Sequence, residues 1–100
     1  MSLLKIFSVR DAKAGFFHPP RILNTHAEAE REFSTLVNDD KTMLGLYPTD
    51  HDLYYLGEFD KNTGRIIGLD SPQHMHNGIS FQKANALNQQ ASQPGVMLQQ

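Results

Sequence analysis

The segment 37–66 constrains the fold of this chain more than any other. It joins a helix end to a compact turn, then to a strand over 53–59 in which Leu53, Tyr55 and Phe59 share one side, and then to a turn that closes at Gly64. A turn of this length that ends in glycine suits a type I turn followed by a left-handed residue, after which residues 65–67 can pair back. The segment therefore predicts a β-hairpin and, with it, an antiparallel sheet.

Length and composition restrict the chain to one small domain. A chain of 100 residues buries only about 60 to 70% of its unfolded surface, so a partner subunit would add stability. Cysteine is absent, which excludes disulfides and thiolate zinc sites and fits a reducing compartment. No run approaches the roughly 18 apolar residues that span a bilayer, and the N-terminus lacks the apolar core of a signal peptide. We expect a protein that is not exported and that contacts no membrane.

The first quarter of the chain predicts two extended segments. Residues 4–10 are β-branched and aromatic enough for a strand with apolar residues on both faces. A turn over 11–15 follows, in which Gly15 is best able to take a positive φ. Residues 16–23 can return as a strand, but Pro19 and Pro20 cannot donate ladder hydrogen bonds. We therefore expect an edge strand or an irregular extended arm.

The region 26–38 predicts the main helix. Thr25 followed by Glu28 forms a capping box, in which the threonine oxygen accepts from an early backbone amide and the glutamate reaches back to the cap. Apolar residues then recur at helical spacing, which places one stripe against a core. Residues 41–47 can form one further helical turn before Pro48 stops it.

The C-terminal part predicts less regular structure. After Leu69 we expect the chain to loosen, residues 79–81 to add a short third strand, and residues 83–100 to form a flexible or frayed-helical tail. The predicted fold class is α+β, with an antiparallel β-sheet of about four strands and one main helix packed on one face, in a single domain over 1–82. The predicted core consists of Phe33, Leu36, Val37, Leu53, Tyr55, Phe59 and Ile66.

Only the histidines suggest metal or catalytic chemistry. His74 and His76 are spaced to place two imidazoles on one side of a strand, but Pro72 and Gly78 flank them and indicate a loop. His51 lies between two aspartates, which favour the imidazolium, yet no local motif supplies a nucleophile, and no phosphate-binding glycine pattern is present. We expect no catalytic residue, no metal site and no cofactor; a histidine metalloenzyme is the least favoured alternative.

Charge is segregated along the chain although the net charge is only −2. Residues 1–26 hold four Lys and Arg residues against one Asp, whereas residues 27–60 hold nine acidic residues against two basic ones. The basic segment interleaves phenylalanines, and cations beside rings that stack on bases are typical of single-strand binding. Phe16 and Phe17 point to opposite faces if extended, so we expect one to be buried and Phe17 to be exposed. The candidate DNA-binding residues are Lys5, Arg10, Lys13, Phe17, His18 and Arg21.

Several motifs taken in order resemble a known phage family. KIFSV followed by Asp11, VND at 37–39, a Tyr-Pro-x-Asp turn at 47–50 and LGEFD-x-x-TG at 56–64 are similar to the small nonstructural protein of gokushovirus-type microviruses, which are single-stranded DNA phages. The resemblance covers residues 4–82. It implies a DNA-binding protein without enzymatic activity that acts in replication or packaging of the genome, in the cytoplasm of the bacterial host.

Two functions are consistent with the sequence. The first is noncatalytic binding of single-stranded DNA by a homo-oligomer, either a dimer or a larger assembly. The alternative is a protein-interaction module that regulates viral replication or capsid filling by contacting a replication or coat protein without touching DNA. The alternative rests on the acidic helix-to-hairpin region and on a proline-bearing edge that can accept another strand.

Overall fold

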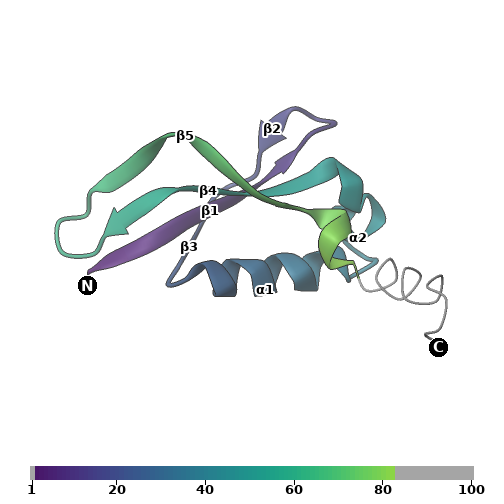
Figure 1. The fold of residues 1–100 in the computed structure, drawn as a ribbon, viewed down its shortest axis with the longest axis horizontal. Helices are drawn as coiled ribbons and strands as arrows, with labels where there is room; N and C mark the ends of the chain where they lie inside the picture. The colour runs from purple at the N-terminus through teal and green to yellow at the C-terminus, as the bar shows by residue number, and fades with distance from the viewer. Residues whose placement is uncertain (1, 83–100) are drawn as a thin grey trace, which may run out of the picture.

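The computed structural model describes residues 2–82, which form a curled antiparallel sheet with a helix along one of its faces (Figure 1). This confirms the predicted α+β class, while the predicted tail over 83–100 lies outside the described residues. None of the helices within 2–82 combines the length and the apolar character needed to cross a membrane. The elements in chain order are β1 (Leu3–Asp11), β2 (Phe16–Phe17), β3 (Arg21–Leu23), α1 (His26–Val37), α2 (Met43–Leu46), the 3₁₀ turn η1 (Pro48–Asp50), β4 (His51–Asp60), β5 (Ile66–Asn77) and the 3₁₀ turn η2 (Gly78–Phe81).

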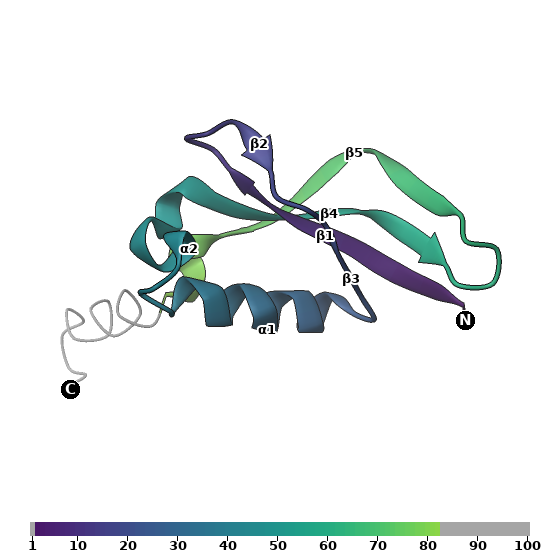
Figure 2. The same ribbon diagram turned by 180° about the vertical axis from the view of Figure 1, so that it is seen from behind.

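The sheet is organised around β1 and β4, which pair along their whole length. The strand order is β2-β1-β4-β5, and β3 also pairs with β1. Phe7 lies opposite Tyr55, and Val9 lies opposite Leu53. Because directly paired residues of an antiparallel ladder share a face, these four side chains point to the same side of the sheet, the side that α1 covers. Figure 2 shows the same arrangement from behind.

The returning arm over 16–23 is an edge strand broken in two. The strand β2 pairs with the end of β1, and β3 pairs with its middle. Pro19 and Pro20 lie in the break, where their missing N–H groups cost no ladder bond. The predicted edge position is confirmed, but the expectation that one phenylalanine is buried is wrong, since Phe16 is 52% exposed and Phe17 is 39% exposed.

The helix α1 begins at the predicted cap. The Thr25 side-chain oxygen accepts from the Glu28 amide at 3.1 Å, and Glu28 Oε1 accepts from the Asn24 amide at 2.8 Å, one residue before the cap. Two otherwise unpaired donors at the helix start are thereby satisfied. The expected further helical turn is present as α2, which Thr42 caps through the Gly45 amide.

The core lies between α1 and the inner face of the sheet. It consists of Phe7, Ala29, Phe33, Val37, Leu44, Leu53 and Tyr55. Two predicted core residues are instead exposed, Leu36 by 39% and Ile66 by 70%. Leu36 lies at the open rim of a cavity beside α1, and Ile66 lies at the end of the β4–β5 hairpin, which extends past the helix (Figure 1). Phe59 is only partly buried, because it pairs with Leu4 and Ile66 on the face that α1 does not cover.

The predicted hairpin after β4 is confirmed. Gly64 has a φ of +78°, and its amide donates to the Asp60 carbonyl at 2.8 Å. Gly57 is also required, because a Cβ at this position would lie 2.3 Å from the Ile67 carbonyl oxygen. The two strands of the hairpin therefore approach more closely here than any side chain would permit.

The structure corrects two expectations for the C-terminal part. Residues 70–77 do not loosen but continue β5, and residues 79–81 form the turn η2 rather than a strand. The ladder between β4 and β5 is irregular between its pairs at Gly68 and Gln73, so Pro72 lies where no regular pairing is required. Asn77 then caps η2 by accepting from the Ile79 amide at 3.1 Å.

Replacing Phe33 by alanine should lower the free energy of unfolding by about 3 to 5 kcal/mol, because Phe33 is 1% exposed and its removal leaves a cavity under the sheet. Urea denaturation followed by far-UV circular dichroism measures the change. The matched control is Leu36→Ala on the same helix, which should cost about 1 kcal/mol or less because the side chain is already partly in water. Equal losses in the two variants would show that the buried face of α1 is misassigned.

Candidate nucleic-acid interface

The sheet face opposite α1 carries a row of three rings from three strands. Phe17 of β2 and Tyr54 of β4 have ring centroids 5.2 Å apart, and Tyr54 and His74 of β5 have centroids 5.3 Å apart. The row follows from strand alternation, because Leu53 and Tyr55 point toward α1 and Tyr54 between them must point away. In Figures 1 and 2, α1 and α2 lie on the other side of the sheet, so no helix of the described chain covers this face. We call Phe17, Tyr54 and His74 the aromatic row.

Positive charge lies at the β2 end of the aromatic row. Arg10 is the cross-strand partner of Phe17, and its guanidinium carbon lies 5.9 Å from the centre of the Phe17 ring. Lys13 is exposed in the turn that follows β1. One carboxylate lies on the same face, because Asp52 of β4 is the cross-strand partner of Arg10. Asp52 also accepts from Asn77 at 3.0 Å and lies 2.9 Å from His74 Nε2. The charge beside the aromatic row is therefore mixed, with a carboxylate directly across the ladder from Arg10.

The structure divides the predicted DNA-binding residues between two sides of the sheet. Arg10 and Phe17 lie together on the open face, with Lys13 in the adjacent turn. The other three residues, Lys5, His18 and Arg21, lie on the side of α1. The six residues thus do not form one continuous basic surface.

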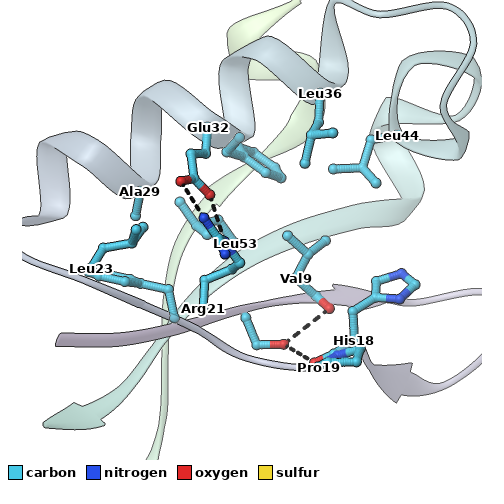
Figure 3. Close-up of a pocket in the computed structure, with 13 residues that line it drawn as sticks. Val9, His18, Pro19, Arg21, Leu23, Ala29, Glu32, Leu36, Leu44 and Leu53 are labelled. Atoms are coloured by element: carbon cyan, nitrogen blue, oxygen red, sulfur yellow. Dashed lines mark hydrogen bonds and ion pairs between the residues drawn. The ribbon is translucent and has the colours of Figure 1, made fainter. Parts of the chain in front are cut away.

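Arg21 is already paired with a carboxylate. Its Nε and Nη2 donate to Glu32 Oε1 and Oε2 at 3.0 and 2.8 Å, an ion pair that Figure 3 shows in the wall of the cavity beside α1. The hydrogen bonds and the opposite charge raise the pKa of Arg21 and lower the pKa of Glu32. A two-pronged pair of this kind leaves Arg21 little capacity to neutralise a phosphate.

The cavity beside α1 has a volume of about 250 Å³ and lies between the helix, β1 and β3 (Figure 3). Its lining is mainly apolar, with Leu23, Leu36 and Leu44 among the contributing side chains. Apart from Arg21 and Glu32, few charged groups converge on it, so it lacks the set of polar groups that would orient a polar ligand.

Sequence reasoning missed Tyr54 and His74. The alternation of β4 could have revealed Tyr54, since its neighbours Leu53 and Tyr55 were both expected in the core. His74 could not be assigned to a strand from the sequence, because the nearby Pro72 indicates a loop. A register shift also separates the two histidines that were expected on one side of a strand: His74 approaches Asp52 on the open face, whereas His76 Nε2 lies 2.6 Å from Glu30 Oε2 on α1.

Comparison with known proteins identifies a family. The family model described as Phage ORF5 protein matches residues 4–81, which is nearly all of the described chain. The comparisons with curated proteins and with solved structures give no match.

The pairing of Glu32 with Arg21 predicts a pH dependence of stability. Because the folded-state pKa of Glu32 lies below its ordinary value of 4.5, its carboxylate stabilises the fold above that pH, and this contribution is lost as the pH falls through the lowered pKa. Glu32→Gln should therefore slightly reduce the urea midpoint at pH 7, because the pair is exposed to solvent. The difference from the parent should shrink as the pH falls below 4.5 and through the lowered pKa of Glu32. A difference that grows on acidification would contradict the assigned role of the pair.

Proposed function

We propose that this chain, which belongs to the Phage ORF5 protein family, binds single-stranded DNA across the open face of its sheet. The observation that carries the proposal is the aromatic row, with Arg10 beside its first ring. Phe17 and His74 are exposed and Tyr54 is half-buried, so rings on this uncovered sheet face can offer apolar faces to unpaired bases, which duplex DNA keeps stacked inside its helix. The function requires no catalytic group.

The charges of the interface predict weak and modestly salt-dependent binding. Each base stacked on an aromatic side chain contributes about 1 to 3 kcal/mol. Arg10 on the open face and Lys13 in the adjacent turn are the cations that can meet phosphate here. A protein that neutralises two phosphates of a single strand has a salt slope of about −1.4 in a plot of log affinity against log salt concentration. Stacking would therefore supply most of the affinity, and several copies on one strand would be needed for tight binding.

The proposed biological setting is supported by the phage family and by the resemblance to gokushovirus-type proteins. Membership of the phage family supports a protein made in an infected bacterial cell. We place its action at the stage when single-stranded genomes of a microvirus are synthesised or packaged in the host cytoplasm, since unpaired DNA is exposed only then in quantity.

Phe17→Ala should weaken binding to a fluorescent single-stranded oligonucleotide by about 5- to 150-fold at low salt, because one stacking contact is lost. Arg10→Ala should reduce the salt slope by about 0.7, because one phosphate contact is lost. Fluorescence anisotropy over a salt series measures both effects.

Arg21→Ala is the matched control, since this arginine is engaged with Glu32 on the side of α1. It should bind the oligonucleotide like the parent. Undetectable binding of the parent at low salt, or equal losses in the Arg10 and Arg21 variants, would remove the open face as the interface.

A second function is favoured by the edge strand β5. Its outer edge is unpaired within residues 2–82, and Ile67 and Leu69 are 46% and 40% exposed beside the still more exposed Ile66. Unpaired strand edges with apolar side chains are typical sites of strand addition. The partner would be a second copy of the chain or a viral replication or coat protein.

Replacing Ile67 by lysine should prevent assembly through β5, because a charge on an edge strand opposes strand addition. Sedimentation analysis should show a dimer or larger assembly for the parent and a smaller species for Ile67→Lys. The control is Lys61→Glu in the adjoining turn, which changes charge without altering the edge. A monomeric parent would leave only a heterologous partner, to be sought by co-purification with phage proteins after nuclease treatment.

A further inference from the structure

Three metal-ligating side chains that are distant in sequence meet at one end of the sheet. Asp11 at the end of β1 and His51 at the start of β4 are cross-strand partners. His18 follows β2, and its amide donates to the Val9 carbonyl at 2.8 Å, which brings it back beside the end of β1. One potential ligand atom from each of the three side chains lies within 4.8 Å of the others.

The buried ring of His51 has a nitrogen without a hydrogen-bond partner. The residue is 1% exposed, and its Nδ1 lies 2.8 Å from the Tyr47 carbonyl oxygen. A carbonyl can only accept, so Nδ1 carries the hydrogen, and in the neutral ring Nε2 presents a lone pair. That Nε2 has no partner, and the carboxylate oxygen Asp11 Oδ2 lies 3.7 Å away, too far for a hydrogen bond. A buried acceptor facing a carboxylate is unfavourable unless a proton or a metal cation lies between them.

The side chains of His51 and Asp11 are each oriented by a further hydrogen bond, as is usual for metal ligands. The contact from Nδ1 of His51 to a backbone carbonyl fixes the ring orientation and the tautomer. The other oxygen of Asp11, Oδ1, accepts from the amides of Lys13 and Ala14 at 3.0 and 3.1 Å. These bonds orient the carboxylate and leave Oδ2 directed toward His51.

We infer that Asp11, His18 and His51 bind one divalent transition-metal ion of the zinc class. Two imidazoles and one carboxylate suit zinc, cobalt or nickel, whereas magnesium and calcium prefer oxygen ligands throughout. Ligand atoms bound to zinc at about 2.1 Å lie roughly 3.4 Å apart in a tetrahedral site, so the three ligand atoms must move slightly closer together when the ion binds. The half-buried His18 ring, which stacks on His51 with centroids 6.3 Å apart and planes 12° apart, can make this movement.

The bound ion would add a direct bond between three elements that already touch through the Ser8 hydroxyl on the His18 carbonyl and the stacking of His18 on His51. It would tie the arm between β2 and β3 to the ends of β1 and β4. Three protein ligands leave a fourth position for water. The inference does not depend on the proposed binding of DNA, because its test measures metal binding and stability alone.

The test uses the full chain freed of metal by a chelator and then titrated with Co²⁺, whose tetrahedral complexes absorb strongly in the visible range. One equivalent of Co²⁺ should bind with the spectrum of a four-coordinate nitrogen and oxygen site, and Zn²⁺ should displace it. A hundredfold excess of Zn²⁺ over its Kd should raise the Tm by on the order of 10 °C. Absence of stoichiometric binding, or binding without a rise in Tm, would overturn the inference.

Two variants locate the ion. His18→Ala and Asp11→Asn should each weaken Co²⁺ binding by at least about tenfold, since even outer contacts of metal ligands contribute 10- to 100-fold. Both residues are more exposed than His51, so these variants should fold, which a melting curve confirms. The matched control is His74→Asn on the open face, where a histidine also approaches an aspartate. If this control loses the ion, or if His18→Ala and Asp11→Asn bind it like the parent, the assigned site is wrong.

A nitrogen-15 NMR spectrum of the metal-free protein supplies an independent measurement. The inference expects Nε2 of His51 to be unprotonated at pH 7.5 and to shift on addition of Zn²⁺. Two protonated ring nitrogens that do not respond to Zn²⁺ would identify an imidazolium paired with Asp11, and the inference would fail.

Discussion

The burial of one face of β1 and β4 against α1 determines the rest of the structure. Phe7 packs on Tyr55 with ring centroids 5.4 Å apart, and both belong to the same core as Phe33. Because side chains alternate along a strand, fixing these residues inside also fixes which residues must face outward. Tyr54 is therefore placed on the open face by the packing of its neighbours. If β4 were shifted by one residue relative to β1, its core residues would point to the open face and Tyr54 would point into the core.

The same alternation separates two arginines of the basic segment. Arg21 lies opposite Phe7 and therefore faces α1, where Glu32 meets it, whereas Arg10 lies opposite Phe17 and faces away. The segregation of charge along the sequence thus becomes a division between the two faces of the sheet. A stretch rich in cations produces a basic surface only when its strands present those cations on one side.

Local signals in the sequence predict the elements of this fold well. The Thr25 cap and the turn closed by Gly64 each depend on neighbouring residues, and each is found as predicted. The predicted alternation of β4 is found at Leu53 and Tyr55, but a register shift between β1 and β4 moves Phe59 to the other face. The errors concern tertiary context. Pro72 is tolerated because β5 has a partner on one side only and pairs irregularly there, and the exposure of Ile66 reflects the length of the hairpin relative to α1.

The candidate sites were less predictable for the same reason. The aromatic row and the cluster of Asp11, His18 and His51 each combine three separate strands or strand ends, and no spacing in a single segment encodes either of them. Net charge is misleading as well, because several acidic side chains have partners within the fold. Glu28 accepts from the amide of Asn24 before α1, and Glu30 and Glu32 meet a histidine and an arginine on the helix side. Negative charge held in this way contributes little repulsion at the opposite face, since screening limits its reach to about 8 to 10 Å in physiological salt. A strand of nucleic acid on the open face would therefore respond mainly to Arg10 and its immediate surroundings rather than to the overall charge.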